Sequence, residues 1–315
     1  MLALSLDMGG THIGCGLVDD YKLLAQSSIP SEGAQSLAAL LPALASTLYN
    51  LAAEAGVATR DCSGLAIGFP GIVNVGNSKI HSTLKKYEDA PLLDLAGWSR
   101  DTFGLPLRIE NDARLALLGE RFAGAARDVS NIVMMTLGTG IGTAVMIQDR
   151  LLRGSHSQAG SLGGHLPVDF RGHKCVCGNI GCAEAEAAGW SLPIVAREFP
   201  AFAESSLAGL SHIGFRELFT HAENGDAIAI TLRQHCLEVW SANAVALIHA
   251  YDPDILVMGG GVMRGANIIV PYVQRHVSEH VWKGGYRPQI HQAALGNMAA
   301  ILGAVPLLAE EIHAA

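Results

Sequence analysis

Four side chains near the middle of the chain have the composition of a closed metal site. They are His165, Cys175, Cys177 and Cys182, and the intervals between them are nine, one and four residues. Three thiolates and one imidazole are a usual ligand set of a structural zinc ion, with no coordination position left for a substrate. The spacing therefore predicts a Zn²⁺ site that shapes a loop and takes no part in catalysis. The other three cysteines lie in apolar stretches and are expected in the core.

Glycine turns follow three apolar stretches and favour a phosphate-binding site. They are Gly9-Gly10-Thr11, Gly138-Thr139-Gly140 and Gly259-Gly260-Gly261. Glycine lets backbone N–H groups approach an anion without an intervening Cβ, and a threonine hydroxyl adds a donor. One glycine turn between strands is usually only a turn, but three together favour a nucleotide site. Neither the dinucleotide fingerprint nor the P-loop occurs, which excludes those two nucleotide-binding classes.

Two carboxylates stand where predicted strands end. Asp7 adjoins the first glycine turn and suits a Mg²⁺–nucleotide complex. Asp112 follows Glu110 and Asn111 at the junction of a strand and a helix. It is either a general base with Asn111 as a hydrogen-bonding neighbour, or a helix cap, a role in which Asp is favoured by about 1 kcal/mol. The sequence leaves both interpretations open.

The composition limits the class of protein. Of 315 residues, 50% are apolar, 16% are charged and 36 are glycine, which excludes intrinsic disorder. The net charge of −8, with no basic block, argues against nucleic acid as a partner. No apolar run reaches the roughly 20 residues that span a bilayer. With cysteines too few for a disulfide scaffold, we expect a cytoplasmic two-domain protein with no membrane partner.

Apolar stretches and helical stretches alternate along the chain, which predicts an α/β protein with mixed sheets. Strands are expected at 2–7, 13–18, 65–68, 107–110, 132–137, 143–147 and 255–258, and helices at 36–55, 113–126, 227–251, 267–282 and 297–313. The first hairpin and the one that begins at residue 132 share a design of strand, glycine turn and strand. This repetition predicts two lobes of similar topology, with chance similarity of two apolar hairpins as the alternative.

Together these motifs resemble the ROK family of bacterial sugar kinases and sugar-responsive repressors. The resemblance covers nearly the whole chain: DMGGT at 7–11, GFPG at 68–71, END at 110–112, LGTGIG at 137–142, GH at 164–165, CVCGNIGCAE at 175–184 and MGGGV at 258–262. The cysteine-rich motif is very specific. The resemblance implies an actin-like ATPase (ribonuclease H-like) fold, with two α/β lobes around a cleft. The N-terminal lobe is expected at 1–113 plus about 298–315, and the C-terminal lobe, with the zinc-binding loop, at 114–297.

The resemblance also implies a role for each motif. Both Gly/Thr turns are expected to bind the phosphates of ATP, and Asp112 is the expected catalytic base. The zinc ion is expected beside a sugar pocket that Asn111, His165 and Glu184 contact, so that His165 serves both zinc and sugar. Gly259–Gly261 are expected against the adenosine. The implied cofactors are ATP, Mg²⁺ and Zn²⁺, and the implied reaction phosphorylates a hexose hydroxyl, the 6-OH.

Within the family the chain most resembles bacterial D-allose kinases, because His12 follows the first glycine turn where Lys is usual. Two positions depart from the family pattern. Ser161 stands where a sugar-contacting Glu is expected, with one residue extra before the histidine, and Leu84-Lys85-Lys86 replaces a Pro-Asn pair. D-Allose or a related hexose is the expected acceptor, and a glucose-type or N-acetylated hexose also fits the family.

Two further functions belong to other classes. Family repressors carry a helix-turn-helix domain ahead of the first phosphate motif. Because that motif begins here at Asp7, we expect no such domain. A non-catalytic sugar-responsive regulator or sugar/nucleotide-binding protein remains open on account of Ser161 and Lys85, although Asp112 and both turns are intact. The expected partners are a hexose and ATP, and the chain is expected to form a homodimer.

Overall fold

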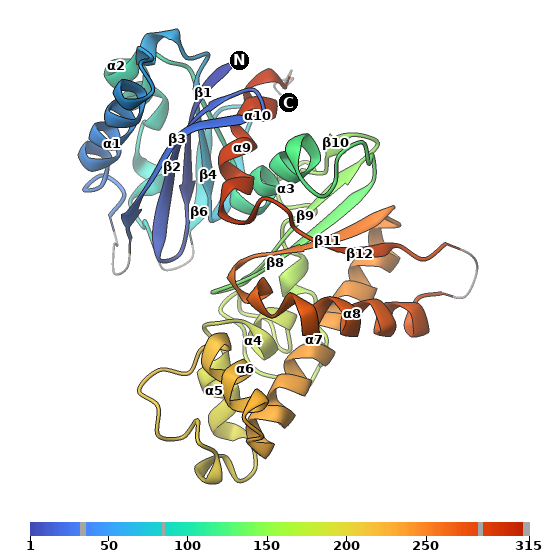
Figure 1. Ribbon diagram of the computed structural model, residues 1–315. Helices are drawn as coiled ribbons and strands as arrows, with labels where there is room; N and C mark the ends of the chain where they lie inside the picture. The colour runs from blue at the N-terminus through green and yellow to red at the C-terminus, as the bar shows by residue number, and fades with distance from the viewer. Residues whose placement is uncertain (32–35, 84–85, 283–285, 311–315) are drawn as a thin grey trace. The chain divides into compact units, whose positions relative to one another are not determined.

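The chain folds into two compact units, each built around one five-stranded sheet (Figure 1). The computed structural model describes residues 1–31, 36–83, 86–282 and 286–310. The first unit comprises Met1–Asp128, Arg153–Ala159 and Ala294–Ala315, and the second comprises Val129–Leu152 and Gly160–Ala293. The chain therefore passes between the units several times.

The first unit has the strand order β3-β2-β1-β4-β7. Its strands are β1 (Leu2–Met8), β2 (His12–Asp19), β3 (Lys22–Pro30), β4 (Leu65–Phe69) and β7 (Leu107–Asn111), and β5 (Gly71–Asn74) pairs with β6 (Lys79–Thr83) in a separate ribbon. The first three strands are antiparallel, whereas β1, β4 and β7 are parallel. The carboxyl ends of these three parallel strands therefore meet at one edge of the sheet.

Helices cover both faces of this sheet. Helices α1 (Leu41–Glu54) and α2 (Leu95–Phe103) pack their apolar residues with those of β1 and β4 in one core. Helices α3 (Asp112–Ala123), α9 (Ala299–Leu302) and α10 (Ala304–Ala309) lie on the other face (Figure 1). Strand β1 is apolar along nearly its whole length because both of its faces are buried.

The second unit has the strand order β10-β9-β8-β11-β12. Its strands are β8 (Ile132–Leu137), β9 (Ile141–Ile147), β10 (Arg150–Leu151), β11 (Ile255–Gly259) and β12 (Gln289–Gln292). Its helices are α4 (Ala183–Ala187), α5 (Leu192–Glu198), α6 (Phe215–Glu223), α7 (Ala227–Tyr251) and α8 (Ala266–His280). Helix α7 crosses the centre of this unit's core and contacts β8, α4, α6 and α8.

The two sheets have the same plan. In each, an antiparallel three-stranded meander is followed by two parallel strands on the other side of its first strand. The repeated hairpins in the sequence therefore reflect a repeated topology, as predicted, and chance similarity is the wrong interpretation. Two α/β lobes with this strand order form the actin-like ATPase fold, which confirms the predicted fold class.

Two helices differ from their predicted bounds. The helix expected at 36–55 begins at Leu41, with Pro42 in its first turn, because a proline lacks the N–H that an interior position needs. The helix expected at 297–313 is divided at Gly303 between α9 and α10, and 311–315 lie outside the described residues. A Cβ on Gly303 would lie 2.0 Å from the carbonyl oxygen of Leu115, so a close approach to α3 requires glycine there.

The domain bounds also differ from those expected. Residues 114–128 belong to the first unit, because α3 packs against α9, α10 and β4. Arg153–Ala159 belong to it as well. Here the Arg114 guanidinium donates to the carbonyl of Ala159 at 2.6 Å, which holds this short segment against α3.

Candidate active site and metal centre

Two carboxylates converge at the carboxyl edge of the first sheet. Asp7 lies near the end of β1, and Asp112 is the first residue of α3, directly after β7. Gly68 of β4 lies between them. A Cβ on Gly68 would lie 3.6 Å from Asp7 Oδ1 and 3.5 Å from the Cα of Asp112. Glycine at this position therefore leaves the space between the two acids clear.

The environment of this strand edge raises the pKa of both carboxyl groups. Burial, and secondarily the charge of Asp112, raises the pKa of Asp7 to about 7. Burial also raises the pKa of Asp112 to about 6, although the backbone N–H of Ala113 donates to its carboxylate at 2.8 Å and opposes the shift. A carboxylate whose pKa lies near neutrality is suited to accept a proton from a hydroxyl. A second carboxylate beside it is suited to bind a cation.

The residue that caps α3 is Asn111 and not Asp112. The Asn111 side chain accepts a hydrogen bond from the N–H of Arg114 at 3.2 Å and donates to the carbonyl of Gly71 at 3.2 Å. The capping interpretation of Asp112 is therefore wrong, because its neighbour fills that role. The expected sugar contact of Asn111 has to be made by a side chain that already holds two partners.

The first residue of the Glu-Asn-Asp motif, Glu110, has a structural role. Glu110 is fully buried and forms ion pairs with Arg153 at 2.7 Å and with Arg114 at 3.4 Å. Arg153 also makes two bonds, of 2.8 and 2.6 Å, with the carboxylate of Glu310. The two carboxylates of this motif therefore have different environments. Glu110 is buried in ion pairs, whereas Asp112 lies at the strand edge, at the start of α3.

The first glycine turn is sharply bent. The N–H of Gly9 donates to the carbonyl of Asp7 at 2.9 Å. A Cβ on Gly9 would lie 2.5 Å from the carbonyl oxygen of His12, so only glycine fits this position. The turn therefore joins β1 to β2 immediately beside the Asp7 carboxylate.

The second glycine turn is held by the main chain. The carbonyls of Gly138 and Thr139 accept hydrogen bonds from the N–H groups of Gly189 and Trp190 at 2.9 and 3.0 Å. In a trans peptide, C=O and N–H point in opposite directions. The N–H groups of Thr139 and Gly140 therefore point away from these donors. A Cβ on Gly138 would meet no protein atom within 4 Å.

The third glycine group lies against the second turn. Gly260 follows β11 with a φ of +91°, and a Cβ there would lie 2.2 Å from the carbonyl oxygen of Leu137, at the end of β8. Both the backbone conformation and this close approach require glycine. The structure thus brings the predicted phosphate turn at 138–140 and the predicted adenosine segment at 259–261 to one edge of the second sheet.

The predicted sugar-binding carboxylate contacts the second turn. Glu184 of α4 accepts a hydrogen bond from the N–H of Ile141 at 2.9 Å and another from the Trp190 indole at 3.2 Å. Its exposed fraction is 8%. A Cβ on Gly140 would lie 2.6 Å from a Glu184 carboxylate oxygen. Glu184 therefore links the glycine turn to the segment that follows the cysteine cluster.

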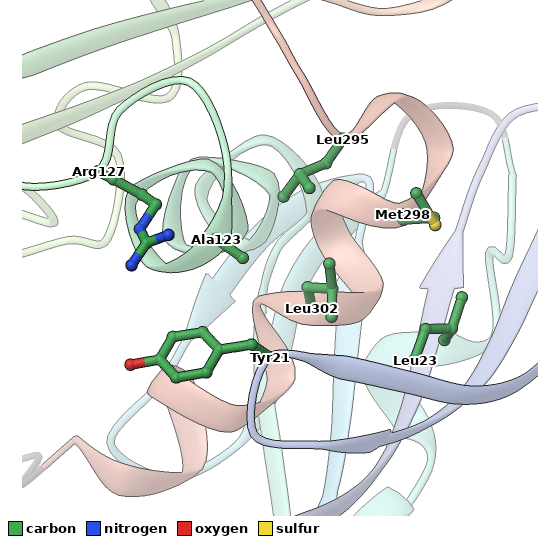
Figure 2. Close-up of a pocket in the computed structure, with 7 residues that line it drawn as sticks. All are labelled: Tyr21, Leu23, Ala123, Arg127, Leu295, Met298 and Leu302. Carbon is green, nitrogen blue, oxygen red and sulfur yellow. The ribbon is translucent and has the colours of Figure 1, made fainter.

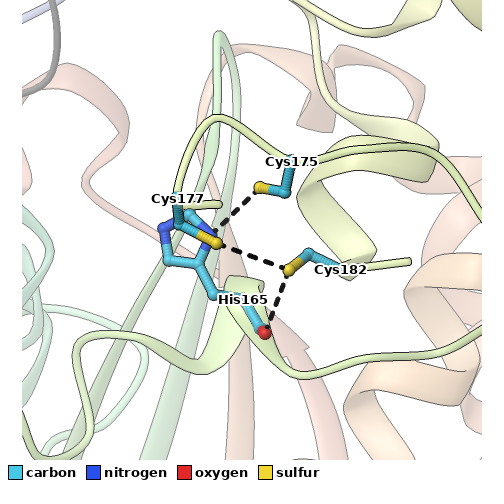
Figure 3. A group of neighbouring side chains, drawn as sticks. All are labelled: His165, Cys175, Cys177 and Cys182. Atoms are coloured by element: carbon cyan, nitrogen blue, oxygen red, sulfur yellow. Dashed lines mark hydrogen bonds between the residues drawn. The ribbon is translucent and has the colours of Figure 1, made fainter. Parts of the chain in front are cut away.

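The predicted metal ligands come together in one cluster (Figure 3). The ligand atoms of His165, Cys175, Cys177 and Cys182 all lie within 4.8 Å of one another. His165 Nδ1 is 3.5 Å from Cys175 Sγ, and Cys177 Sγ is 3.7 Å from Cys182 Sγ. These separations and this donor set fit a tetrahedral metal ion. The cluster precedes α4 directly, so an ion bound there would anchor the helix that carries Glu184.

A separate hollow in the first unit contains none of the predicted site residues (Figure 2). Its volume is about 510 Å³, and it lies between Tyr21 and Leu23, the end of α3 at Ala123, and Leu302 of α9. Arg127 also lines it. The candidate site therefore rests on the strand edges and not on this hollow.

Of the two departures from the family pattern, one lies partly outside the described residues. Leu84 and Lys85 are not described, whereas Lys86 is. Ser161 lies in the loop before the 3₁₀ helix η3 (Gly163–His165), which carries the histidine of the cluster. Within the described part of the chain, no helix is long and apolar enough to cross a membrane.

Comparison with known proteins gives the family. The profile of the ROK family matches residues 3–311, and the chain therefore belongs to the ROK family. The glucokinase of Thermotoga maritima is 28% identical over 98% of each chain. The N-acetylmannosamine kinase of Citrobacter koseri is 32% identical over 83% of this chain and 84% of its own. The crystal structure of a ROK family glucokinase from Streptomyces griseus with glucose and AMPPNP matches with a TM-score of 0.81 and 26% identity, over 98% of this chain and 99% of the other.

Proposed function

We propose that this protein is an ATP-dependent hexose kinase. The observation that carries the proposal is the pair of carboxylates above Gly68, where the pKa of Asp112 is raised to about 6 and that of Asp7 to about 7. The names of its relatives support the same reaction class, because they include a glucokinase and an N-acetylmannosamine kinase. The glucokinase that was solved with glucose and AMPPNP supports a nucleotide and a hexose as the two substrates.

In this proposal Asp112 is the general base. Its carboxylate accepts the proton of the acceptor hydroxyl while the hydroxyl oxygen bonds to the γ-phosphorus. The bond between the γ-phosphorus and the bridging oxygen breaks, and ADP leaves with that electron pair. General base catalysis of this kind contributes typically 10²- to 10⁴-fold.

Asp7 and the glycine turns position the nucleotide. Asp7 is the residue that would hold Mg²⁺, which neutralises developing charge on the phosphate oxygens. Backbone N–H groups of Gly9–Thr11 and Gly138–Gly140 donate to the phosphates, and Gly259–Gly261 lie against the adenosine. Phosphoryl transfer depends on positioning and electrostatics, and backbone donors supply both with no side-chain motion.

We assign Zn²⁺ to His165, Cys175, Cys177 and Cys182 as a structural ion. His165 presents Nδ1 to Cys175 Sγ, which leaves Nε2 available for a sugar hydroxyl. With the loop fixed in this way, Asn111, His165 and Glu184 are the proposed sugar contacts. D-Allose or a related hexose is the proposed acceptor, phosphorylated at the 6-OH.

A coupled assay of ADP release tests the proposal, with D-allose, D-glucose, N-acetylated hexoses and ketoses as acceptors. At least one hexose should stimulate ADP release well above the sugar-free rate, and its 6-deoxy analogue should not. Nucleotide and sugar binding without turnover for any acceptor would instead favour the non-catalytic binding protein. Equal rates with a hexose and its 6-deoxy analogue would contradict the 6-OH assignment.

A further inference from the structure

The carbonyl groups of the first glycine turn all face protein donors. Lys86 Nζ donates to the carbonyl of Gly10 at 2.6 Å and to that of Gly9 at 3.2 Å. Ser31 completes the set, because its N–H donates to the carbonyl of Thr11 at 2.9 Å and its hydroxyl to that of Gly9 at 3.3 Å. Lys86 and Ser31 also bond to each other at 2.9 Å. This group, Lys86 with Ser31, is called the lysine clamp below.

The clamp determines where the N–H groups of the turn point. Because C=O and N–H are opposed across each trans peptide, carbonyls that face the clamp send the next three N–H groups to the opposite side. These are the N–H groups of Gly10, Thr11 and His12. Successive N–H groups that point to one side form an anion-binding concavity. Glycine peptides rotate easily, so without the clamp a flipped peptide would present a carbonyl to the phosphate.

The backbone that positions Lys86 is strained. Tyr87 has a φ of +57°, a left-handed backbone conformation that is unusual and strained for a bulky side chain. The Tyr87 ring is fully buried, packs on Phe69 and lies 4.9 Å from Lys86 Nζ. Burial of the ring thus fixes the strained residue, and the strained residue directs its neighbour to the turn.

The clamp also brings an ammonium group to the turn. The two residues that follow Gly10 in the turn are Thr11 and His12, and neither carries an ammonium or guanidinium group. His12 is exposed, and its ring nitrogen hydrogen-bonds the Thr11 hydroxyl at 3.1 Å. The Lys86 ammonium lies directly behind the turn, although it is 76 residues away from Gly10 in sequence. Its charge adds to the dipoles of N–H groups that point to the other side.

We propose that Lys86 is a positioning residue for the polyphosphate of the nucleotide, which keeps the N–H groups of the first glycine turn directed at the phosphates and adds positive charge behind them. This inference rests on the proposed nucleotide site but not on the identity of the sugar. Lys86 contributes to nucleotide affinity, and the hexose affinity does not depend on it.

The test compares Lys86→Met with Lys86→Arg and with Lys79→Met, which removes an exposed lysine of β6 in the same unit. Calorimetry with Mg²⁺ and AMPPNP, in the absence of sugar, measures nucleotide affinity. Lys86→Met should weaken it about 10- to 100-fold, the range for a lost hydrogen bond to a charged group. Lys86→Arg should recover most of the loss, and Lys79→Met should bind as the wild type does.

Two further measurements separate positioning from a general loss of structure. The melting temperature and the KM for the hexose should change little in Lys86→Met, while the KM for ATP rises. Nucleotide affinity equal to that of the wild type, or a parallel loss of nucleotide and hexose affinity, would overturn the inference. If Lys86→Met does not fold, Ser31→Ala provides the same test with a smaller expected loss, and unchanged nucleotide affinity in that variant would overturn it. Because no sugar is present in the calorimetry, failure of every acceptor would contradict the proposed function alone.

Discussion

The two glycine turns solve one problem with different chemical groups. In both turns the backbone carbonyls accept hydrogen bonds from other parts of the protein. The N–H groups of the same peptides therefore point away from those donors. In the first turn the donors are the Lys86 ammonium and Ser31, whereas in the second they are the main-chain N–H groups of Gly189 and Trp190. The repeated sheet thus repeats the geometry of the turn, while each unit supplies its own means of holding it.

The ends of the neighbouring strands differ as well. In the first unit they carry Asp7 and Asp112, and in the second they carry Gly138–Gly140 and Gly259–Gly261. In the proposed function, acid–base chemistry and Mg²⁺ therefore belong to the first sheet edge and the adenosine to the second, while a glycine turn of each edge donates backbone N–H groups to the phosphates. The variants below test this division of roles.

The largest effect on nucleotide binding is expected from Gly138→Val. Its side chain would meet no protein atom at Cβ, so folding should be retained while the nucleotide is obstructed. Nucleotide affinity should fall about 100-fold, as expected for the loss of charged hydrogen bonds, and calorimetry measures it. Gly209→Val is the matched control, because Gly209 in the same unit is exposed and also has open space at Cβ. Wild-type nucleotide affinity in Gly138→Val would remove the second turn from the proposed site.

Loss of the metal should affect the second unit first. Cys177→Ser should reduce zinc from about one ion per chain to almost none, because the tetrahedral set is then incomplete. Turnover should fall at least tenfold, since the loop before Glu184 loses its anchor. Elemental analysis and the ADP-release assay measure both quantities. The control variant Cys62→Ser changes a cysteine of the first unit and should still bind about one zinc ion per chain. A full complement of zinc in Cys177→Ser would contradict the assignment of the ligands.

The two hairpins could be predicted from the sequence because their strands are buried and apolar. The cysteine cluster could be predicted because its ligands are close together in the sequence. Strands β3 and β12 were not predicted, since β3 is largely exposed and β12 is a short, polar edge strand. No local pattern could indicate that Lys86 contacts Gly10, or that Gly189 contacts Gly138. Such contacts join residues that are far apart in the sequence, and they form only because the tertiary fold brings these residues together. The carboxylates Asp7 and Asp112 were found because each adjoins the end of an apolar stretch.

A smaller effect is expected where the main chain holds the second turn. A Cβ on Gly189 would lie 2.8 Å from the carbonyl oxygen of Gly138 and 3.2 Å from Thr139 Cα. Gly189→Ala should therefore displace the turn by a few tenths of an ångström and weaken nucleotide binding about fivefold to tenfold, roughly 1 kcal/mol. Gly209→Ala serves as the control in the same titration. An unchanged affinity would show that the turn adapts without this support.

The smallest effect concerns stability at the first sheet edge. The folded-state pKa of Asp7 is about 7, whereas an unperturbed Asp has a pKa of about 4. Between these values the folded protein keeps a proton that the unfolded chain has lost, so stability falls as the pH rises through this range. Without Mg²⁺, Asp7→Asn should therefore melt a few degrees above the wild type at pH 8 and close to it at pH 4. Asp101→Asn, an exposed change in α2, should have no such effect. If Asp7→Asn instead melted below the wild type at pH 8, the conclusion that the buried, ionised Asp7 carboxylate destabilises the folded protein would be contradicted.

The most direct measurement is the turnover of Asp112→Asn as a function of pH, with the best hexose acceptor. The substitution keeps the size of the side chain and removes its basicity, and the cap of α3 remains with Asn111. The account predicts nearly unchanged binding of hexose and nucleotide and a kcat lower by at least about 100-fold. It also predicts that wild-type kcat/KM rises with pH through an apparent pKa of about 6, and that this rise is absent in the variant. Wild-type turnover in Asp112→Asn would contradict the assignment of Asp112 as the general base.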